Sequence, residues 1–210
     1  PIYSALEIYN EEMNFGMSTN CNLLLGINFN LMEEYGKAGE IFLKIINTSG
    51  SHKMTELIKG RAYHNLGNIY SKQGQSKKAI QMLIKSLQFK KEYAKTNTIY
   101  LLAKVYFAIG EVEKGKKWLS KGMHLAKKTN DSDYQLKFSI LYYQGMNEIE
   151  SLQYHDLLKK AISYFKDTAS FSFPYECAKL LAEIRAKEFH YKEAYEYLQL
   201  ASNLMKSNRN

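Results

Sequence analysis

The sequence predicts an all-α fold, a right-handed superhelical solenoid of stacked helical hairpins. Two observations lead to this prediction. Only two prolines occur in 210 residues, so little in the chain would break a helix. Four segments also repeat one order of small and aromatic residues, which is typical of helix pairs that cross at close range. Because a single hairpin cannot bury its apolar face, we expect neighbouring hairpins to stack and form the core together.

The repeat is clearest when residues 62–87 are aligned with residues 99–123. Both segments contain the same series of residues in the same order: a leucine followed by a small residue, a tyrosine, a turn glycine, a second small residue and a second leucine. Residues 24–46 and 178–201 fit most of this order. Small side chains allow two helix axes to approach, so we expect close helix contacts at Gly67, Ala79, Ala103, Gly115, Ala182 and Ala194.

The hydrophobic and turn patterns predict five helix pairs, at 18–48, 54–92, 95–129, 133–167 and 175–206. Gly74 and Gly110 suit the ends of first helices, because glycine readily adopts the left-handed conformation that follows a helix C-terminus. Residues 1–13 resemble a second helix whose partner is missing. We therefore expect a single repeat domain over 1–210, with about five hairpins after a leading lone helix, and a fragment of a longer protein.

Composition narrows the class of protein. Hydrophobic residues make up 45% of the chain and charged residues 24%, which indicates a globular chain. No apolar run is long enough to cross a membrane and no signal peptide opens the chain, so we expect a cytoplasmic protein without a membrane partner. Cys21 and Cys177 form no metal or redox motif, and reduced thiols are expected.

No catalytic motif is recognisable. The five histidines lack the spacing of metal ligands, and no phosphate-binding glycine loop or nucleophile elbow occurs. Neighbouring carboxylates such as Glu33 and Glu34 are expected in solvent. The sequence thus predicts a protein that is not an enzyme, has no catalytic residues, and binds neither a metal nor a cofactor.

A polar stripe runs along the first helix of the second pair, opposite its packing positions. The stripe consists of Arg61, His64, Asn68 and Ser71, and the next first helix continues it as Asn97, Tyr100 and Lys104. In a solenoid of hairpins the first helices line the concave surface, so we expect these side chains to face a groove.

Asn68 is the strongest binding candidate in this stripe. Asparagine is a poor helix former, but its amide can bond both the N–H and the C=O of an extended peptide. Arg61, Asn97 and Lys104 flank it and could hold a ligand carboxylate. Asn65 points more toward the neighbouring repeat and is the weaker candidate. The alternative is that both asparagines are ordinary solvated residues of a helix surface.

The net charge of +8 is concentrated in residues 61–130. The lysines of residues 61–130 fall on or beside second helices and are expected to face outward. They would form a solubilising surface or a docking patch for an acidic partner. These residues are Lys77, Lys78, Lys85, Lys90, Lys91, Lys114, Lys116, Lys117, Lys121, Lys127 and Lys128. Arginine is scarce, which argues against dense phosphate or base recognition.

The repeat resembles the tetratricopeptide repeat, two antiparallel helices of about 34 residues with small residues where they cross. The C-terminal half adds a second resemblance. Residues 116–144 combine a long amphipathic helix, an Asn-Asp-Ser-Asp turn and an aromatic-rich helix, and residues 157–201 add a helix, a Phe-Pro turn and a terminal hairpin. Together they are similar to the C-terminal repeats of the Rap/PlcR/NprR-type peptide-pheromone receptors of Gram-positive bacilli.

This resemblance implies a function and partners. In such receptors a short reimported signalling peptide lies in the concave groove, and asparagines of first helices hold its backbone. Asn68 and Asn97 match that role here. Binding changes curvature or oligomeric state, so a homo-oligomer and a response-regulator protein are further implied partners. DNA would be contacted only through an N-terminal effector domain that this sequence lacks. Arg185 departs from the family pattern, because a tyrosine is usual there.

Two rival classes stay open at this point. One is a generic tetratricopeptide scaffold for protein assembly, including a clamp for a C-terminal carboxylate. That clamp is disfavoured, because His64 and Leu101 replace its lysine and its second asparagine. The other is an enzyme or a protein that binds nucleic acid directly, and the only feature that favours it is the set of basic residues within 61–130.

Overall fold

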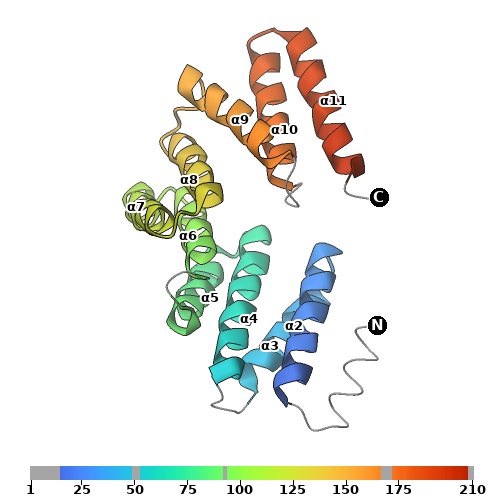
Figure 1. The fold of residues 1–210 in the computed structure, drawn as a ribbon, viewed down its shortest axis with the longest axis vertical. Coiled ribbons are helices and arrows are strands. Elements are labelled where there is room, and N and C mark those ends of the chain that lie inside the picture. The colour runs from blue at the N-terminus through green and yellow to red at the C-terminus, as the bar shows by residue number, and fades with distance from the viewer. Residues whose placement is uncertain (1–14, 49–52, 92–93, 167–171, 208–210) are drawn as a thin grey trace. The chain divides into compact units, whose positions relative to one another are not determined.

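The computed structural model describes residues 15–48, 53–91, 94–166 and 172–207, and every regular element within these ranges is an α-helix (Figure 1). The helices are α2 (Phe15–Leu31), α3 (Tyr35–Asn47), α4 (Lys53–Lys72), α5 (Ser76–Phe89), α6 (Thr96–Ala108), α7 (Val112–Lys128), α8 (Ser132–Gly145), α9 (Leu152–Phe165), α10 (Ser172–Lys187) and α11 (Tyr191–Ser207).

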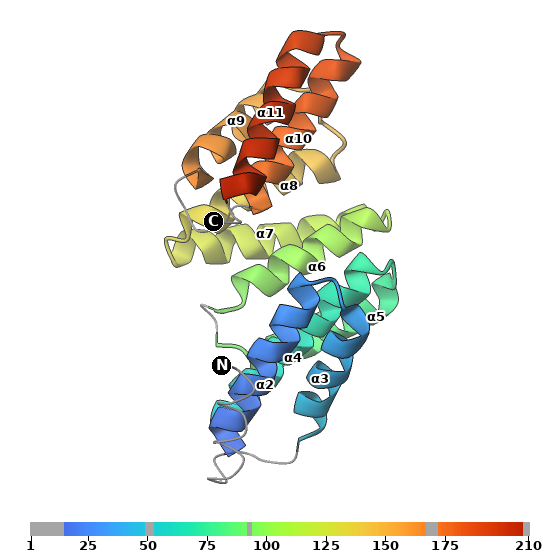
Figure 2. The ribbon, with the colours of Figure 1, turned by 90° about the vertical axis from the view of Figure 1, so that its right-hand side faces the viewer.

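The five predicted helix pairs are confirmed, and their ends agree with the observed helices to within three residues. The lone helix predicted for residues 1–13 lies outside the described residues. Contacts between elements divide the chain into two compact units, residues 1–130 (unit 1) and residues 131–210 (unit 2). Each unit is a stack of hairpins in which the two helices of a pair pack side by side, as α6 and α7 do in Figure 2.

All five first helices end in the same turn. The backbone N–H of the residue directly after the left-handed residue donates to the carbonyl of the residue five positions earlier, in the last turn of the helix. The carbonyls belong to Phe29, Tyr70, Tyr106, Tyr143 and Arg185, at N–O distances of 2.8–3.0 Å. The left-handed residues are Glu33, Gly74, Gly110, Asn147 and Phe189, with φ between 58° and 77°. The two turn glycines predicted from the sequence are therefore confirmed.

Neighbouring hairpins of unit 1 stack through the second helix of one hairpin and the first helix of the next, and their first helices also contact each other. Helix α2 packs on α4 and α4 packs on α6, while α3 contacts α4 and α5 contacts α6. The core between the first two hairpins includes Leu23, Phe42 and Leu66, all at most 1% exposed. The first helices of unit 1 thus form a continuous surface, which we call the first-helix surface and which carries the predicted polar stripe.

The predicted small positions lie at the helix crossings. Gly67 is buried, and a Cβ atom added to it would lie 2.8 Å from Leu83 Cγ. A Cβ atom on Gly26 or Gly115 would meet Phe42 or Phe107 at 2.7 and 2.6 Å. Real Cβ atoms do not approach carbon so closely, so any larger residue at these positions would force the neighbouring side chain or helix to move.

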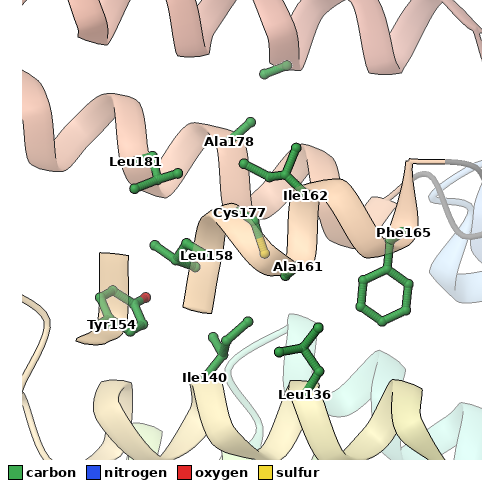
Figure 3. Packing of buried hydrophobic residues seen from close by; sticks show 11 residues of the cluster. Leu136, Ile140, Tyr154, Leu158, Ala161, Ile162, Phe165, Cys177, Ala178 and Leu181 are labelled. Atoms are coloured by element: carbon green, nitrogen blue, oxygen red, sulfur yellow. The ribbon is translucent and has the colours of Figure 1, made fainter. Parts of the chain in front are cut away.

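Unit 2 has a core of its own, to which α8, α9, α10 and α11 all contribute side chains (Figure 3). Leu136 and Ile140 of α8 point toward Leu158 and Ala161 of α9, and Cys177 of α10 lies beside them. Burial raises the pKa of the Cys177 thiol to about 12, so this cysteine is an inert packing residue. Capping side chains start two helices of the unit: Asp131 accepts from the Tyr134 N–H at 3.1 Å and Ser151 from the Tyr154 N–H at 3.3 Å.

A search of the described residues found no helix with the length and apolarity needed to cross a membrane.

Candidate functional site

Five polar side chains meet on unit 1 where α4, the end of α5 and the start of α6 come together. They are Arg61, His64, Lys90, Asn97 and Thr98, and we call them the Lys90 cluster. The ammonium group of Lys90 donates to Asn97 Oδ1 at 3.0 Å and to Thr98 Oγ1 at 2.8 Å. The Nδ1 atom of His64 lies 3.0 Å from the same Thr98 hydroxyl. Side chains from three successive helices are thereby joined in one network.

The C-terminal end of α5 is held against α4, and this contact delivers Lys90 to the cluster. The buried Ser86 hydroxyl donates to the Gly60 carbonyl at 2.7 Å, and the Phe89 ring stacks on Tyr63 with centroids 5.6 Å apart. A Cβ atom on Gly60 would lie 2.9 Å from Phe89 Cβ, so glycine allows this approach. Lys90 then leaves the helix with an extended backbone, at φ −93° and ψ 140°.

Burial and like charge govern the electrostatics of the cluster. Burial, with the nearby charge of Lys90, lowers the pKa of His64 to about 3, so the imidazole is neutral at physiological pH. Burial, with the charge of Arg61, lowers the pKa of Lys90 to about 8. Across residues 15–48, 53–91, 94–166 and 172–207, no carboxylate forms an ion pair with Arg61 or Lys90. The cluster therefore gathers positive charge that the described chain does not neutralise.

The half-buried His64 makes unit 1 sensitive to mild acid. Its folded-state pKa of about 3 lies below the value of 6.5 for an exposed histidine, so only the unfolded chain takes up this proton as the pH falls from about 6.5 to about 3. Each pH unit in that window should cost roughly 1.4 kcal/mol of unfolding free energy. Urea unfolding at pH 7 and pH 5, followed through Trp118, should therefore show a smaller acid loss in His64→Gln than in the unchanged protein.

His124, which is exposed on α7, supplies the matched control. His124→Gln should lose as much stability between pH 7 and pH 5 as the unchanged protein does. If His64→Gln shows that same loss, the imidazole of His64 takes up a proton in the folded protein and its assignment as neutral is wrong.

The remaining predicted site residues extend from the cluster along α4 and α6. Asn68 and Ser71 follow His64 on α4 and are half-buried, and Tyr100 (half-buried) and Lys104 (exposed) follow Asn97 on α6. The part of the chain that the structure describes offers the Asn68 amide no hydrogen-bond partner. By contrast, Asn65 donates to the carbonyl of Arg61 at 2.9 Å, a bond within its own helix. The two asparagines of α4 therefore differ in what they leave available to a ligand.

The prediction for Lys90 is wrong, and the other ten lysines assigned to the outer face are exposed as expected. Lys90 is half-buried and bonded to Asn97 and Thr98. The residue is the C-terminal cap of α5, so the helical periodicity that placed the other lysines does not apply to it. Sequence analysis also missed Thr98, which neighbours a predicted residue but reads as an ordinary helix position. Contacts between repeats, which no local pattern reveals, bring both into the site.

No group of three or more His, Cys, Asp or Glu side chains in the described part of the chain is arranged to hold a metal ion. The amides, hydroxyls and cations of the first-helix surface instead suit hydrogen bonding to a polar ligand.

Comparison with known proteins identifies related sequences. Residues 60–93 match the family described as tetratricopeptide repeat. The transcriptional activator NprA of Geobacillus stearothermophilus is 26% identical over 217 aligned positions, which cover 97% of this chain and 52% of that protein. The response regulator aspartate phosphatase I of Bacillus subtilis is 29% identical over 178 positions, which cover 80% of this chain and 44% of that protein. The chain thus spans about half the length of these relatives, and both carry the names of regulators.

A solved structure confirms the fold class. The crystal structure of NprR in complex with its cognate peptide NprX superposes with a TM-score of 0.78 at 22% identity, covering 98% of this chain and 57% of that one. The predicted all-α solenoid of tetratricopeptide-like hairpins is therefore confirmed.

Proposed function

We propose that this chain is the peptide-binding sensor of a cytoplasmic quorum-sensing regulator. The proposal is supported by the tetratricopeptide-repeat match and by the resemblance to the C-terminal part of Rap/PlcR/NprR-type receptors. It binds a short signalling peptide on the first-helix surface. Binding then changes conformation or oligomeric state and so controls transcription or a phosphorelay. In this proposal residues 1–210 act as one sensor domain.

The observation that carries the proposal is the Asn68 amide. It is half-buried on α4, and the described residues leave its donors and its acceptor unused. An amide without an intramolecular bond is available to a ligand, and its pattern of donors and acceptor complements the backbone of an extended peptide. Arg61, His64 and Ser71 continue the stripe on the same helix. The complex of NprR with its cognate peptide supports this choice of ligand, because its fold is the same.

The proposed role is binding and not catalysis. One relative is named as a phosphatase, but unit 1 presents amides, hydroxyls and cations where the peptide is placed. A response regulator and a second copy of the chain are the proposed downstream partners. Any contact with DNA is assigned to a separate effector domain of the regulator.

A peptide selection tests the function. Immobilised protein is exposed to a pool of random hexapeptides, and the retained peptides are identified by mass spectrometry and then measured by calorimetry. We expect a small set of related sequences with dissociation constants in the micromolar range or below. If no peptide is retained above the level of an unrelated helical protein, the sensor function is wrong and a scaffold for whole proteins becomes the better reading.

The exposed lysines of α7 test whether the peptide binds to the first-helix surface or to the second helices. Reversal of Lys116, Lys117 and Lys121 to glutamate should leave the affinity for a selected peptide nearly unchanged at 150 mM salt. These exposed charges lie on a second helix, and salt screens their effect on a peptide bound to the first-helix surface. The same variant should lose any nonspecific retention on DNA. Calorimetry and a DNA column measure the two effects. A large loss of peptide affinity would place the binding site on the second helices and contradict the proposal.

A further inference from the structure

We propose that the Lys90 cluster is a carboxylate site, in which Lys90 and Arg61 bind an anionic group of the peptide that Asn68 holds by its backbone. This inference rests on the proposed function and names the chemical class of its ligand. It also moves the expected carboxylate contact from the exposed Lys104 to the half-buried Lys90.

The first argument is charge. Burial and the nearby charge of Arg61 lower the pKa of Lys90, and no carboxylate of the described residues forms an ion pair with either cation. His64 is neutral and adds no negative charge. Lys90 is half-buried and Arg61 is exposed. A protein does not gain stability from a half-buried cation that has a second cation nearby and no anion beside it, because the half-buried cation loses hydration and the two charges repel. Such an arrangement is typical of a binding site whose anion comes from outside the chain.

The second argument is the set of hydrogen-bond donors. An ammonium group has three N–H donors, and Lys90 uses two of them on Asn97 and Thr98. These two bonds fix the position of the ammonium group and leave one donor for a ligand. The guanidinium of Arg61 has no hydrogen-bond partner among the described residues and can bind a carboxylate with two parallel bonds.

The third argument is the start of α6. The first N–H groups of a helix lack partners within the helix and carry partial positive charge. Thr96 is the first residue of α6, and its hydroxyl is buried, at 2% exposure of the residue, without a hydrogen-bond partner in the described part of the chain. An anion near the Lys90 cluster would therefore also be favoured by this helix end.

The spacing along α4 connects the cluster with Asn68. Four residues separate His64 from Asn68, about 6 Å along a helix, and seven separate Arg61 from Asn68, about 10 Å. An extended peptide advances about 3.3 Å per residue. A peptide held at Asn68 would therefore present an anionic group two or three residues away to Lys90 and Arg61. That group is either the C-terminal carboxylate or the side chain of Asp or Glu.

Paired peptide pools test the proposal. Four pools of random hexapeptides are offered to the immobilised full chain, with a free or amidated C-terminus and with or without Asp and Glu. The unchanged protein should retain carboxylate-bearing peptides about tenfold or more over the amidated pool without acids, as expected for a charge-assisted bond. A preference for free C-termini alone, or for Asp and Glu alone, identifies the source of the carboxylate. Equal retention of all four pools overturns the proposal.

Variants locate the site. Lys90→Met and Arg61→Gln should each reduce the preference for carboxylates about tenfold. Lys90→Arg keeps the charge and should retain most of the preference, which controls for damage to the fold. Lys85→Met, on an exposed position of α5, should leave it unchanged. If Lys90→Met keeps the full preference, the carboxylate lies elsewhere and the proposal is wrong.

A second measurement separates this inference from the proposed function. Sodium acetate is titrated against the imidazole NMR signals of His64, with sodium chloride at equal ionic strength as the reference. A saturable shift that Lys90→Met abolishes supports the carboxylate site even if no peptide is retained, and the peptide-sensor function alone then fails. Retained peptides without carboxylate preference, together with no acetate shift, leave the function standing and remove the inference.

Discussion

Replacing Gly67 with valine is expected to lower the unfolding free energy of unit 1 by about 3 kcal/mol, the upper part of the range for overpacked cores. A Cβ atom at this position lies 2.8 Å from Leu83 Cγ and 3.3 Å from the backbone oxygen of Ala79. Leu83 is fully buried and cannot move aside without disturbing its neighbours, so α4 and α5 must separate. Urea unfolding followed by the fluorescence of Trp118, the single tryptophan of the chain, reports on this unit.

Gly39 of α3 supplies the matched control. A Cβ atom there meets only Leu66 Cδ1, at 3.9 Å, so Gly39→Val should change stability by less than about 1 kcal/mol. Combining Gly67→Val with Leu83→Ala should cost less than the sum of the two single changes, because the smaller side chain makes room for valine. Equal losses for Gly67→Val and Gly39→Val would show that close packing at Gly67 is not what closes the hairpin.

Replacing Asn68 with alanine is expected to weaken a selected peptide about tenfold to a hundredfold, while the protein melts at the same temperature or slightly higher. The peptide backbone would lose its amide partner, at a cost of about 1–3 kcal/mol. The free protein would lose no internal hydrogen bond, since the described residues offer Asn68 none, and alanine is the better helix former by roughly half a kcal/mol. Calorimetry with the selected peptide and a thermal melt measure the two effects.

Asn65→Ala is the control within the same helix. The Asn65 amide donates to the Arg61 carbonyl, so replacing Asn65 with alanine should change peptide affinity by less than about threefold. A variant Asn68→Ala that melts early and binds normally would make this asparagine structural. A variant Asn65→Ala that binds as weakly as Asn68→Ala would mean that the peptide displaces the bond within the helix.

Local patterns were enough to predict the helices of this protein and their pairing. Small residues at Gly67, Ala79 and Ala103 repeat at helical spacing because two helices must approach there, and all three are buried. The turn glycines Gly74 and Gly110 predict the left-handed conformation that the structure has at these positions. Glu33 and Phe189 adopt the same conformation without any such signal in the sequence, in turns closed by the same backbone hydrogen bond.

The sequence by itself determined the fold class, the five hairpins, and the stripe that contains Asn68, because each depends on spacing within one or two neighbouring helices. Only the tertiary structure decided which polar groups meet. In the folded chain Asn65 bonds to a carbonyl of its own helix, and Asn68 has no partner among the described residues. Lys90, which was expected to be a surface charge, lies at the centre of a hydrogen-bonded cluster. The physical reason is that Lys90 follows the last residue of α5, where helical periodicity ends, and its position depends on how α5 is held against α4 and next to α6.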